Sequence, residues 1–412
     1  MRVLPARIID TVAPRRLGSS FRWLLSATVI NNVGDGIAIA AGPLLVASQT
    51  RDPFLVSMAL LSQYLPMLLF GVIGGVAADR FDRRRMVVVV DLLRAAVLIA
   101  LVAMIVSGTV SITLVLVVLF VLGTAETFAD SATSTLLPGL VAREDLGIAN
   151  SRMQGAFLLT NQLVAPPIGA FLFAAGMALP FAANAAAFTL GAVLISRVVT
   201  SVREDRGEGS SFRADMVEGI RWLVAHPPMR TLALTIFTFN VTYGAAWAVL
   251  VLYAIERLGM DEVGFGLLTT AVAVGGIIGI VSYGRLERRF SLADIMRVGL
   301  LIETGTHLVL ALTTSPAIGL ATMVVFGTHA FVWGTTSTVV RQRAVPNELL
   351  GRVTGVYRVA SVGGLVVGTP VGGLLASSFG ITAPFWFGFA GSALLVTLLW
   401  RHFEHIAHAE AV

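Results

Sequence analysis

The stretch Gly75-Val-Ala-Ala-Asp79-Arg80-Phe-Asp82-Arg83-Arg84-Arg85 places a dense group of charges between two long apolar runs. The runs beside it, residues 54–78 and 86–106, are each long enough to cross a bilayer, which takes about 20 residues of helix. Membrane proteins concentrate their basic residues in cytoplasmic loops. The stretch therefore predicts two membrane-spanning helices that are joined on the inner side of the membrane.

Composition extends this interpretation to the whole chain. Of 412 residues, 56% are apolar and 13% are charged, and the mean hydropathy is +0.85. A soluble domain carries about 25% charged residues, so too few polar groups are present to cover a water-exposed surface. Cysteine is absent, which excludes disulfides, thiol catalysis and thiolate metal sites. The first residues lack a compact apolar core, so we expect no cleavable signal peptide.

Twelve apolar runs alternate with charged or Pro/Gly-containing breaks, and each run predicts one membrane-spanning helix. Two of the runs contain Pro166 and Pro370, which a membrane helix tolerates when neighbouring groups satisfy the freed backbone. The predicted spans are 22–47, 54–78, 86–106, 111–137, 147–174, 177–197, 229–255, 263–284, 293–313, 317–341, 351–377 and 380–400.

Basic residues alternate between the two sides of this map. One side carries Arg80, Arg83, Arg84, Arg85, Arg143, Arg203, Arg206, Arg285, Arg288, Arg289, Arg341 and Arg343, whereas the other carries Arg51 and Arg257. The arginine excess marks the cytoplasmic side. We therefore expect a multi-pass protein of the inner cell membrane with both termini in the cytoplasm.

The two halves of the chain resemble each other at a shift of 204 residues. Matching pairs include Glu144 with Glu348, Gly147 with Gly351, Pro166 with Pro370 and Gly169 with Gly373, while Asn32 and Gly36 match Asn240 and Gly244 at a shift of 208. Duplicated six-helix halves are a transporter architecture, with the substrate site at mid-membrane between them. The sequence thus predicts an all-α membrane protein of twelve transmembrane helices in two pseudo-symmetric six-helix bundles, 1–197 and 229–412.

Residues 198–228 form the predicted cytoplasmic linker between the bundles. Phe212, Met216, Ile220 and Leu223 recur in it at helical spacing. We expect an amphipathic helix that lies at the cytoplasmic membrane interface, rather than a regulatory binding site.

The quoted loop resembles the signature of the major facilitator superfamily, a Gly, three residues, Asp-Arg and then a basic cluster. A weaker copy runs from Gly279 to Arg289, with Tyr283 in place of the Asp. The resemblance implies a cytoplasmic gate formed by Gly75, Asp79, Arg80, Arg83 and Arg84, in which ion pairs and helix dipoles hold the inner side closed. The alternative is that the arginines only enforce the positive-inside topology.

The fifth span, Ala165-Pro166-Pro167-Ile168-Gly169-Ala170, resembles the Gly-Pro-x-x-Gly-Gly segment of antiporters in this superfamily. Alanine stands at two of its usual glycine positions. Pro370 and Gly373 form the corresponding segment of the eleventh span. The resemblance implies an exporter; the alternative is close packing of small residues around a kink.

Four further stretches resemble the enterobactin-exporter and macrolide-efflux-like branch of the superfamily. They are Asn32-Val-Gly-Asp35-Gly, Asp91-Leu-Leu-Arg94, Glu218-Gly-Ile-Arg-Trp and Pro346-Asn-Glu-Leu-Leu-Gly351-Arg352-Val. That branch exports siderophores and drugs, so the resemblance implies this class of cargo without naming one substrate.

An ionisable side chain near the centre of a span raises the free energy of membrane insertion by about 2.5–3.5 kcal/mol. Such side chains therefore mark candidate functional sites. The candidates named next fall on spans one, four, seven and ten, which line the central cavity in the superfamily that the chain resembles. The proton-coupling candidates are Asp35, Glu126 and Asp130, because a carboxyl group in an apolar cavity can exchange a proton near neutral pH. The substrate-cavity candidates are Asn32, Asn240, Tyr243, Trp247, His329 and Trp333.

Structural explanations compete with these roles. Each carboxyl group could be a hydrogen-bonded structural element, and the aromatic residues could serve packing. Asp91 with Arg94, and Glu303 with His307, stand one helical turn apart, and we expect each to be a structural pair.

The sequence therefore predicts a secondary active transporter, a proton-coupled exporter (antiporter) of small amphipathic molecules such as drugs or siderophores, working by alternating access. The alternative is a proton-coupled importer of a metabolite with the same fold. We expect a monomer in the lipid bilayer whose partners are a small-molecule substrate and protons. No enzyme activity, cofactor, metal or nucleic acid is expected, because no nucleotide-binding loop, metal cluster or nucleophile triad is evident.

Overall fold

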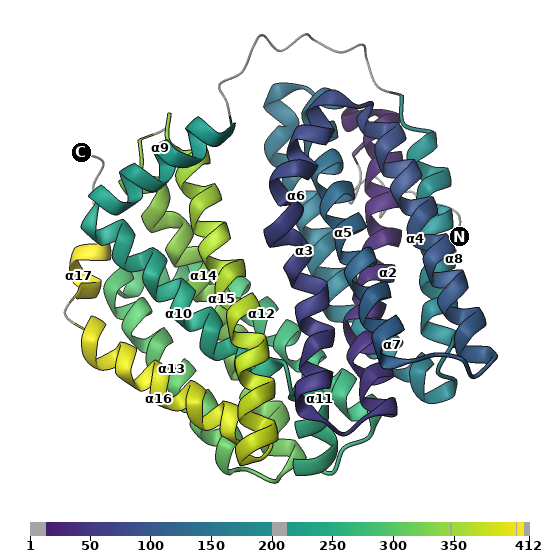
Figure 1. The fold of residues 1–412 in the computed structure, drawn as a ribbon. Coiled ribbons are helices and arrows are strands. Elements are labelled where there is room, and N and C mark those ends of the chain that lie inside the picture. The colour runs from purple at the N-terminus through teal and green to yellow at the C-terminus, as the bar shows by residue number, and fades with distance from the viewer. Residues whose placement is uncertain (1–13, 200–211, 347, 401, 408–412) are drawn as a thin grey trace, which may run out of the picture. The chain divides into compact units, whose positions relative to one another are not determined.

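A computed structural model describes residues 14–199, 212–346, 348–400 and 402–407. All regular structure in these ranges is helical (Figure 1). The linker arginines Arg203 and Arg206 lie outside the described residues. The chain divides into two compact units, of which unit 1 is Met1–Gln49 with Leu65–Glu204 and unit 2 is Thr50–Tyr64 with Asp205–Val412.

The first six predicted spans correspond to these helices: α2 (Gly18–Gln49), α3 (Pro53–Arg80), α4 (Arg83–Val106), α5 (Ile112–Leu136), the continuous series α6 (Leu146–Ala156), η4 (Phe157–Val164) and α7 (Ala165–Ala175), and α8 (Leu179–Ser196). Asp82 caps α4, its carboxylate accepting a hydrogen bond from the Arg85 amide at 2.8 Å. This is the usual role of an acidic residue at a helix N-terminus.

The fifth span is π-helical over η4, directly before Pro166 and Pro167. Proline lacks the amide proton that an α-helix needs and its ring crowds the carbonyl of the preceding turn. A wider turn accommodates both effects without ending the span. The sequence predicted a kink at this place, and the π-helical stretch is the form that it takes.

The remaining spans correspond to α10 (Pro227–Trp247) with α11 (Leu250–Leu252) and η5 (Tyr253–Arg257), then α12 (Glu262–Arg289), α13 (Leu292–Leu312), α14 (Pro316–Ala344), α15 (Leu350–Phe379) and α16 (Ala383–Leu399). The seventh span, predicted as one helix, is bent by 43° between Trp247 and Leu250. Neither proline nor glycine lies between these residues, so the sequence carries no visible signal for the bend.

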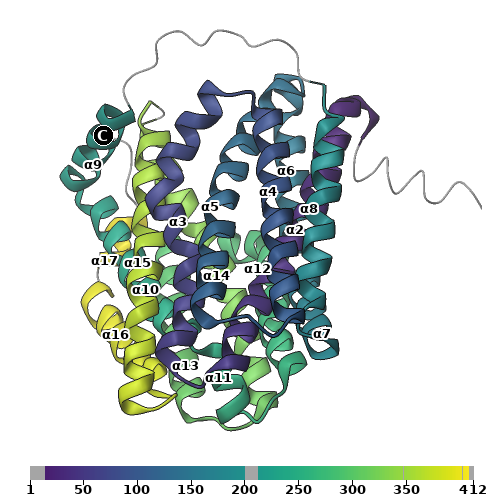
Figure 2. The same ribbon diagram turned by 45° about the vertical axis from the view of Figure 1, so that its right-hand side comes forward.

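Helix packing is alike in the two units. In unit 1, α2 packs on α7 and α8, while α4 packs on α5 and α8 (Figures 1 and 2). In unit 2, α10 packs on α15 and α16, while α13 packs on α14 and α16. In both halves the first span packs on the fifth and sixth spans, and the third span packs on the fourth and sixth. The packing therefore bears out the pseudo-symmetry that the sequence repeat predicts.

Ten described helices are long and apolar enough to cross a membrane, the bent pair adds one, and Ala383–Leu399 is a shorter apolar helix. These twelve segments match the twelve predicted spans. The all-helical, twelve-span fold class is thus confirmed.

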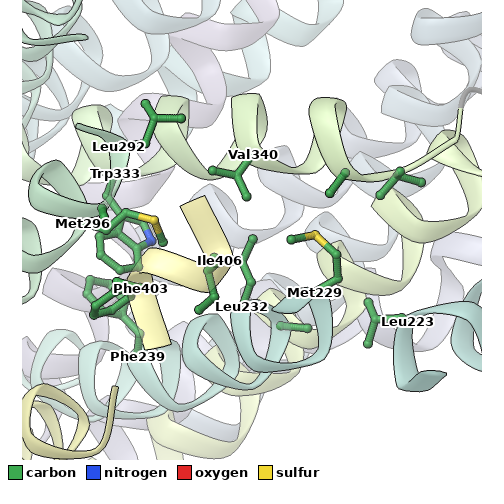
Figure 3. Close-up of a cluster of buried hydrophobic side chains, with 14 of the residues drawn as sticks. Leu223, Met229, Leu232, Phe239, Leu292, Met296, Trp333, Val340, Phe403 and Ile406 are labelled. Atoms are coloured by element: carbon green, nitrogen blue, oxygen red, sulfur yellow. The ribbon is translucent and has the colours of Figure 1, made fainter. Parts of the chain in front are cut away.

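Two amphipathic pieces complete unit 2. The helix α9 (Phe212–Ala225) and the short α17 (His402–Ala407) contribute Leu223, Phe403 and Ile406 to the core formed by α10, α13 and α14 (Figure 3). Of the predicted apolar residues of α9, Leu223 is buried and Ile220 is 44% exposed, and the position of α9 at the membrane interface stays a prediction. The helix packs on α15 at Gly219, where a Cβ would lie 3.0 Å from the Arg352 carbonyl oxygen. The side chain of Phe212 is outside the described part of the structure.

Candidate functional site

Arg94 on α4 is the centre of a charge cluster in unit 1. Its guanidinium donates a hydrogen bond to Asp35 on α2, and only 3% of its side chain is exposed. Its Nη1 lies 3.9 Å from Asp91 Oδ1, and its Nη2 lies 4.0 Å from Glu126 Oε2 on α5. One guanidinium thus faces three carboxylates from three helices.

Asp91 is the most deeply buried of these carboxylates, with no exposed side-chain surface. Asn31 on α2 donates a hydrogen bond from Nδ2 to Asp91 Oδ2 at 2.8 Å. Room for Asn31 depends on Gly191 of α8, because a Cβ there would overlap the Asn31 amide. The expected pairing of Asp91 with Arg94 is confirmed, and the structure adds Asn31 and Asp35 to it.

The other carboxylates are progressively more open. The side chain of Asp35 is 15% exposed and that of Glu126 is 46% exposed. Asp130, one turn after Glu126 on α5, is also exposed and interacts electrostatically with Asp91 and Arg94. All three proton-coupling candidates therefore belong to one cluster around Arg94.

Phe188 on α8 stacks against Arg94, with the guanidinium carbon 3.8 Å from its ring centroid. A cation over an aromatic face is attracted by the ring quadrupole, more strongly when water is excluded. Phe188 is fully buried. It fixes the guanidinium plane without using any of its hydrogen-bond donors.

The cluster contains more negative than positive groups. Asp35, Asp91, Glu126 and Asp130 are four carboxyl groups against the single Arg94, so full ionisation would leave a net charge of −3. Uncompensated charge in a membrane-spanning bundle is costly. Protonation of some of the carboxyl groups would lower that cost. When a proton binds to or leaves one carboxyl group, the Arg94 guanidinium can pair with the carboxylates that remain ionised.

Aromatic candidates gather in unit 2. Tyr243 and Trp247 on α10 have ring centroids 4.3 Å apart, and Phe326 on α14 lies 5.6 Å from Tyr243 and 4.6 Å from Trp247. Tyr243 and Trp247 are half-buried, whereas Phe326 is buried. The two predicted residues thus form an aromatic group with Phe326, a residue that sequence reasoning missed.

Three other substrate-cavity candidates face the interior of unit 2. Asn240 Nδ2 donates to the Ile236 carbonyl at 2.8 Å and to Ser361 Oγ of α15 at 3.3 Å. Trp333 is 3% exposed and stacks on Phe239. His329 is likewise buried, as described next, so a cavity role for these residues stays a prediction.

His329 on α14 belongs to a buried triad with two residues of α13. Its Nε2 lies 3.3 Å from Glu303 Oε2, and His307 Nε2 lies 3.0 Å from Glu303 Oε1. The expected pairing of Glu303 with His307 is confirmed, and His329 is its third member. Asn32, the remaining candidate, is on α2 of unit 1 with its Nδ2 buried and without a hydrogen-bond partner among the described residues.

The signature loop is fastened to helix ends within unit 1. Arg83 Nη1 donates to the carbonyl of Thr135 near the end of α5, and Arg84 Nη1 to that of Val198 beyond α8, both at 3.1 Å. Cations at helix C-termini complement the helix dipole. Asp79 is 65% exposed and lies 3.8 Å from Arg83, one turn away.

Two other residues of the loop have open surroundings. Gly75 has open space where a Cβ would stand, and Arg80 is exposed in the last turn of α3. The gate role of the loop remains a prediction.

Small residues of the antiporter-like segments bring helices into contact. A Cβ at Gly169 would lie 2.5 Å from the Ile37 carbonyl oxygen of α2, and Pro166 beside it is buried. In α15, which contains Pro370, a Cβ at Gly373 would overlap Ser57. These contacts show that the small residues serve close packing, and the antiporter role of the segments stays a prediction.

Among the residues that the structure describes, no group of three or more His, Asp or Glu side chains is placed to hold a metal ion. The buried groups are instead paired with one another.

The residues that sequence reasoning missed or undervalued lie on spans one, three, six and ten. Arg94 was read as half of a local pair, and Asn31 and Phe188 were not singled out. A basic residue in the middle of an apolar run is a signal in itself, since it needs a carboxylate partner. Phe188 carries no such signal, because one phenylalanine among many apolar residues has no distinguishing pattern.

This chain is similar to known proteins over most of its length. A family model described as transmembrane secretion effector matches residues 9–412. The multidrug efflux pump Tap of Mycolicibacterium fortuitum is 29% identical over 381 residues, covering 88% of this chain and 90% of the relative. The enterobactin exporter EntS of Escherichia coli O9:H4 (strain HS) is 25% identical over 407 residues, covering 93% of each chain.

Solved transporters share the fold. A bacterial homologue of the iron transporter ferroportin in its inward-facing state has a TM-score of 0.74 at 18% identity, covering 93% of this chain and 98% of the other. A D-xylose-proton symporter has a TM-score of 0.73 at 16% identity, covering 95% and 99%. The chain therefore belongs to the transmembrane secretion effector family of the major facilitator superfamily.

Proposed function

We propose that this protein is a proton-coupled exporter of small amphipathic molecules, working as an antiporter by alternating access. The observation that carries the proposal is the Arg94 cluster, in which one buried cation serves three carboxylates of graded exposure. Relatives named as a multidrug efflux pump and an enterobactin exporter support the outward direction. The membrane is the inner cell membrane, with both termini in the cytoplasm.

The carboxylates divide the work by their surroundings. Asp91, fully buried and held by Asn31, anchors Arg94. Glu126 is the accessible group that receives a proton or meets a cationic substrate. Asp35 is the switch: when it is protonated its bond to Arg94 weakens, and the guanidinium is freed toward Glu126.

Antiport follows if proton and substrate compete for the same charges. Deprotonation leaves excess negative charge that favours a cationic or polarised substrate, and reprotonation removes that attraction. A ligand shifts the conformational equilibrium only by its different affinity for the two states. Because both cargoes act on the Arg94 cluster, binding of one excludes the other, and the two half-reactions run in opposite directions.

In this proposal the aromatic group of unit 2 binds the apolar part of the substrate. The half-buried Tyr243 and Trp247 offer ring faces on which a flat drug-like molecule can stack. In the proposed cycle the six-helix halves, 1–197 and 229–412, move by rocking, so that access alternates between the two sides of the membrane. Asp79 and the basic cluster beside it close the cytoplasmic side.

Everted membrane vesicles test the direction and the coupling together. In them an exporter accumulates its cargo, so a panel of dyes, antibiotics and siderophores should enter when the lumen is acidified. Collapse of the pH gradient with nigericin should abolish that uptake. Substrate-induced alkalinisation outside intact cells, with accumulation inside, would instead identify a proton-coupled importer and overturn the proposal.

A matched pair of variants assigns the result to the cluster. Glu126→Gln removes one carboxylate of the cluster, while Glu256→Gln removes an exposed one at the end of η5. Only the first should lose gradient-driven uptake. Equal uptake by both variants would remove Glu126 from the mechanism.

A further inference from the structure

Three titratable side chains in unit 2 have no part in the Arg94 cluster. Glu303 and His307 on α13 and His329 on α14 have no exposed side-chain surface. Each imidazole presents its Nε2 to a different oxygen of the same carboxylate, at 3.0 Å for His307 and 3.3 Å for His329. The carboxylate of Glu303 therefore bridges two rings from two helices, α13 and α14.

Glycines make room for the two rings. A Cβ at Gly388 of α16 would lie 2.5 Å from His307 Nδ1, and one at Gly299 of α13 would lie 3.0 Å from His329 Nδ1. Both Nδ1 atoms are buried and have no hydrogen-bond partner among the described residues. Each ring is therefore closely packed, while its Nδ1 makes no hydrogen bond to the described residues.

Charge balance sets how many protons the triad holds. With Glu303 ionised and both rings neutral it carries −1, with one more proton it is neutral, and with two it carries +1. An unpaired charge without solvent is expensive, whereas a neutral hydrogen-bonded set is not. Among the described residues, Tyr243 of α10 is the further titratable group that interacts electrostatically with Glu303, and it adds no positive charge.

We propose that Glu303, His307 and His329 form a second proton-binding site, which holds one exchangeable proton within unit 2. The proton sits either on an imidazole beside the carboxylate or on the carboxyl group between neutral rings, and both forms keep the two Nε2 contacts. The ligand proposed is a proton, because the two Nε2–carboxylate distances, 3.0 and 3.3 Å, are those of hydrogen bonds.

The site is placed to sense the aromatic group. The His329 ring lies 6.0 Å from both Phe239 and Phe326, and Phe326 contacts Tyr243 and Trp247. A change of charge on His329 is therefore one side chain away from the surface proposed to hold substrate. This inference stands without the Arg94 mechanism, because it concerns a site in the other unit.

Spectroscopy of the full-length protein in detergent tests the proton count directly. With histidine labelled by ¹⁵N, ring signals distinguish neutral from charged imidazole, and His329→Gln identifies which signal belongs to that ring. Infrared spectra report whether a carboxyl group is protonated. At about pH 8, well above the ordinary histidine pKa of about 6.5, we expect one imidazolium or one protonated carboxyl signal that Glu303→Gln abolishes and Glu256→Gln keeps.

Two results would overturn the inference. One is a wild-type spectrum at this pH with both rings neutral and Glu303 ionised. The other is a carboxyl or imidazolium signal that does not shift when the protein is transferred to D₂O, since an exchangeable proton must be replaced by deuterium. The wild-type and His329→Gln spectra decide the count even where Glu303→Gln does not fold. Neither readout requires transport, so failure of the export proposal leaves this test intact.

Discussion

The guanidinium of Arg94 on α4 donates a hydrogen bond to the carboxylate of Asp35 on α2. The two helices also share α8 as a packing neighbour, so the pair lies inside a three-helix contact. A proton on Asp35 would weaken a bond between helices without exposing either group to water. In the proposed mechanism, protonation of Asp35 is therefore linked to the packing of unit 1.

Arg94→Met should destabilise the protein by about 3–5 kcal/mol, because it leaves a buried carboxylate without its cation. The double variant Arg94→Met/Asp91→Asn should recover part of that loss, since the most buried negative charge is then gone. Thermal unfolding of the purified proteins measures both. The exposed Arg51→Met is the control, and equal unfolding temperatures for the single and double variants would contradict the account.

Asp91→Asn and Glu126→Gln should separate stability from coupling. Asp91 is fully buried and bonded to Asn31, so its amide variant should unfold at a lower temperature. Glu126 is 46% exposed and 4.0 Å from Arg94, so its variant should keep its unfolding temperature and lose proton-driven transport. Unfolding curves and vesicle uptake on the same preparations provide the comparison; a reversed pattern would show that the two roles are misassigned.

Trp247→Ala should weaken the apparent affinity for aromatic cargo by roughly two- to tenfold, the range expected for losing one aromatic contact of about 0.5–1.5 kcal/mol. The number of protons moved per substrate should not change, because Trp247 lies outside the Arg94 cluster. Concentration series of uptake measure the affinity. Trp386→Ala removes a 42%-exposed indole on α16 and serves as the control; an equal loss in both would contradict a specific role for Trp247.

Gly169→Ala should destabilise the protein by about 1–3 kcal/mol, because the added methyl meets the backbone of Ile37 at 2.5 Å. Gly155→Ala in the same span meets open space and should be neutral or stabilising by up to about 1 kcal/mol. Unfolding temperatures of the two variants test this directly. A tolerated Gly169→Ala would mean that α7 and α2 are less tightly packed than described.

Spans were predictable from sequence because hydropathy is a local property. A run of about 20 apolar residues is stable as a helix that crosses the bilayer. The span that ends before Arg80 could therefore be predicted without knowledge of its neighbours. The bend between Trp247 and Leu250 could not be foreseen, since no proline or glycine marks it. The stretch before Pro166 was expected to kink, but only packing decides that the kink is π-helical.

Pairing between spans was less accessible. Asp91 with Arg94 and Glu303 with His307 follow from helical spacing alone. The bonds of Arg94 to Asp35 and of Glu303 to His329 depend on which helix faces which, and spacing within one span says nothing of that.

Register within the repeat shows the same limit. The sequence matches Gly169 to Gly373, yet packing sets Gly169 against Ile37 and Gly372 against Ala245, the residues related by the shift of 208 found for the first span of each half. A one-residue difference is invisible in a glycine-rich segment and changes the face that each glycine presents.

Proteoliposomes that hold a pH-sensitive dye test the central claim, that Asp35 couples protons to cargo through Arg94. A substrate gradient imposed on the wild-type protein should drive protons in the opposite direction. Asp35→Asn should still exchange internal for external substrate, but it should move no protons. Glu256→Gln should behave as the wild type does. Proton movement by Asp35→Asn at the wild-type ratio to substrate would contradict the account.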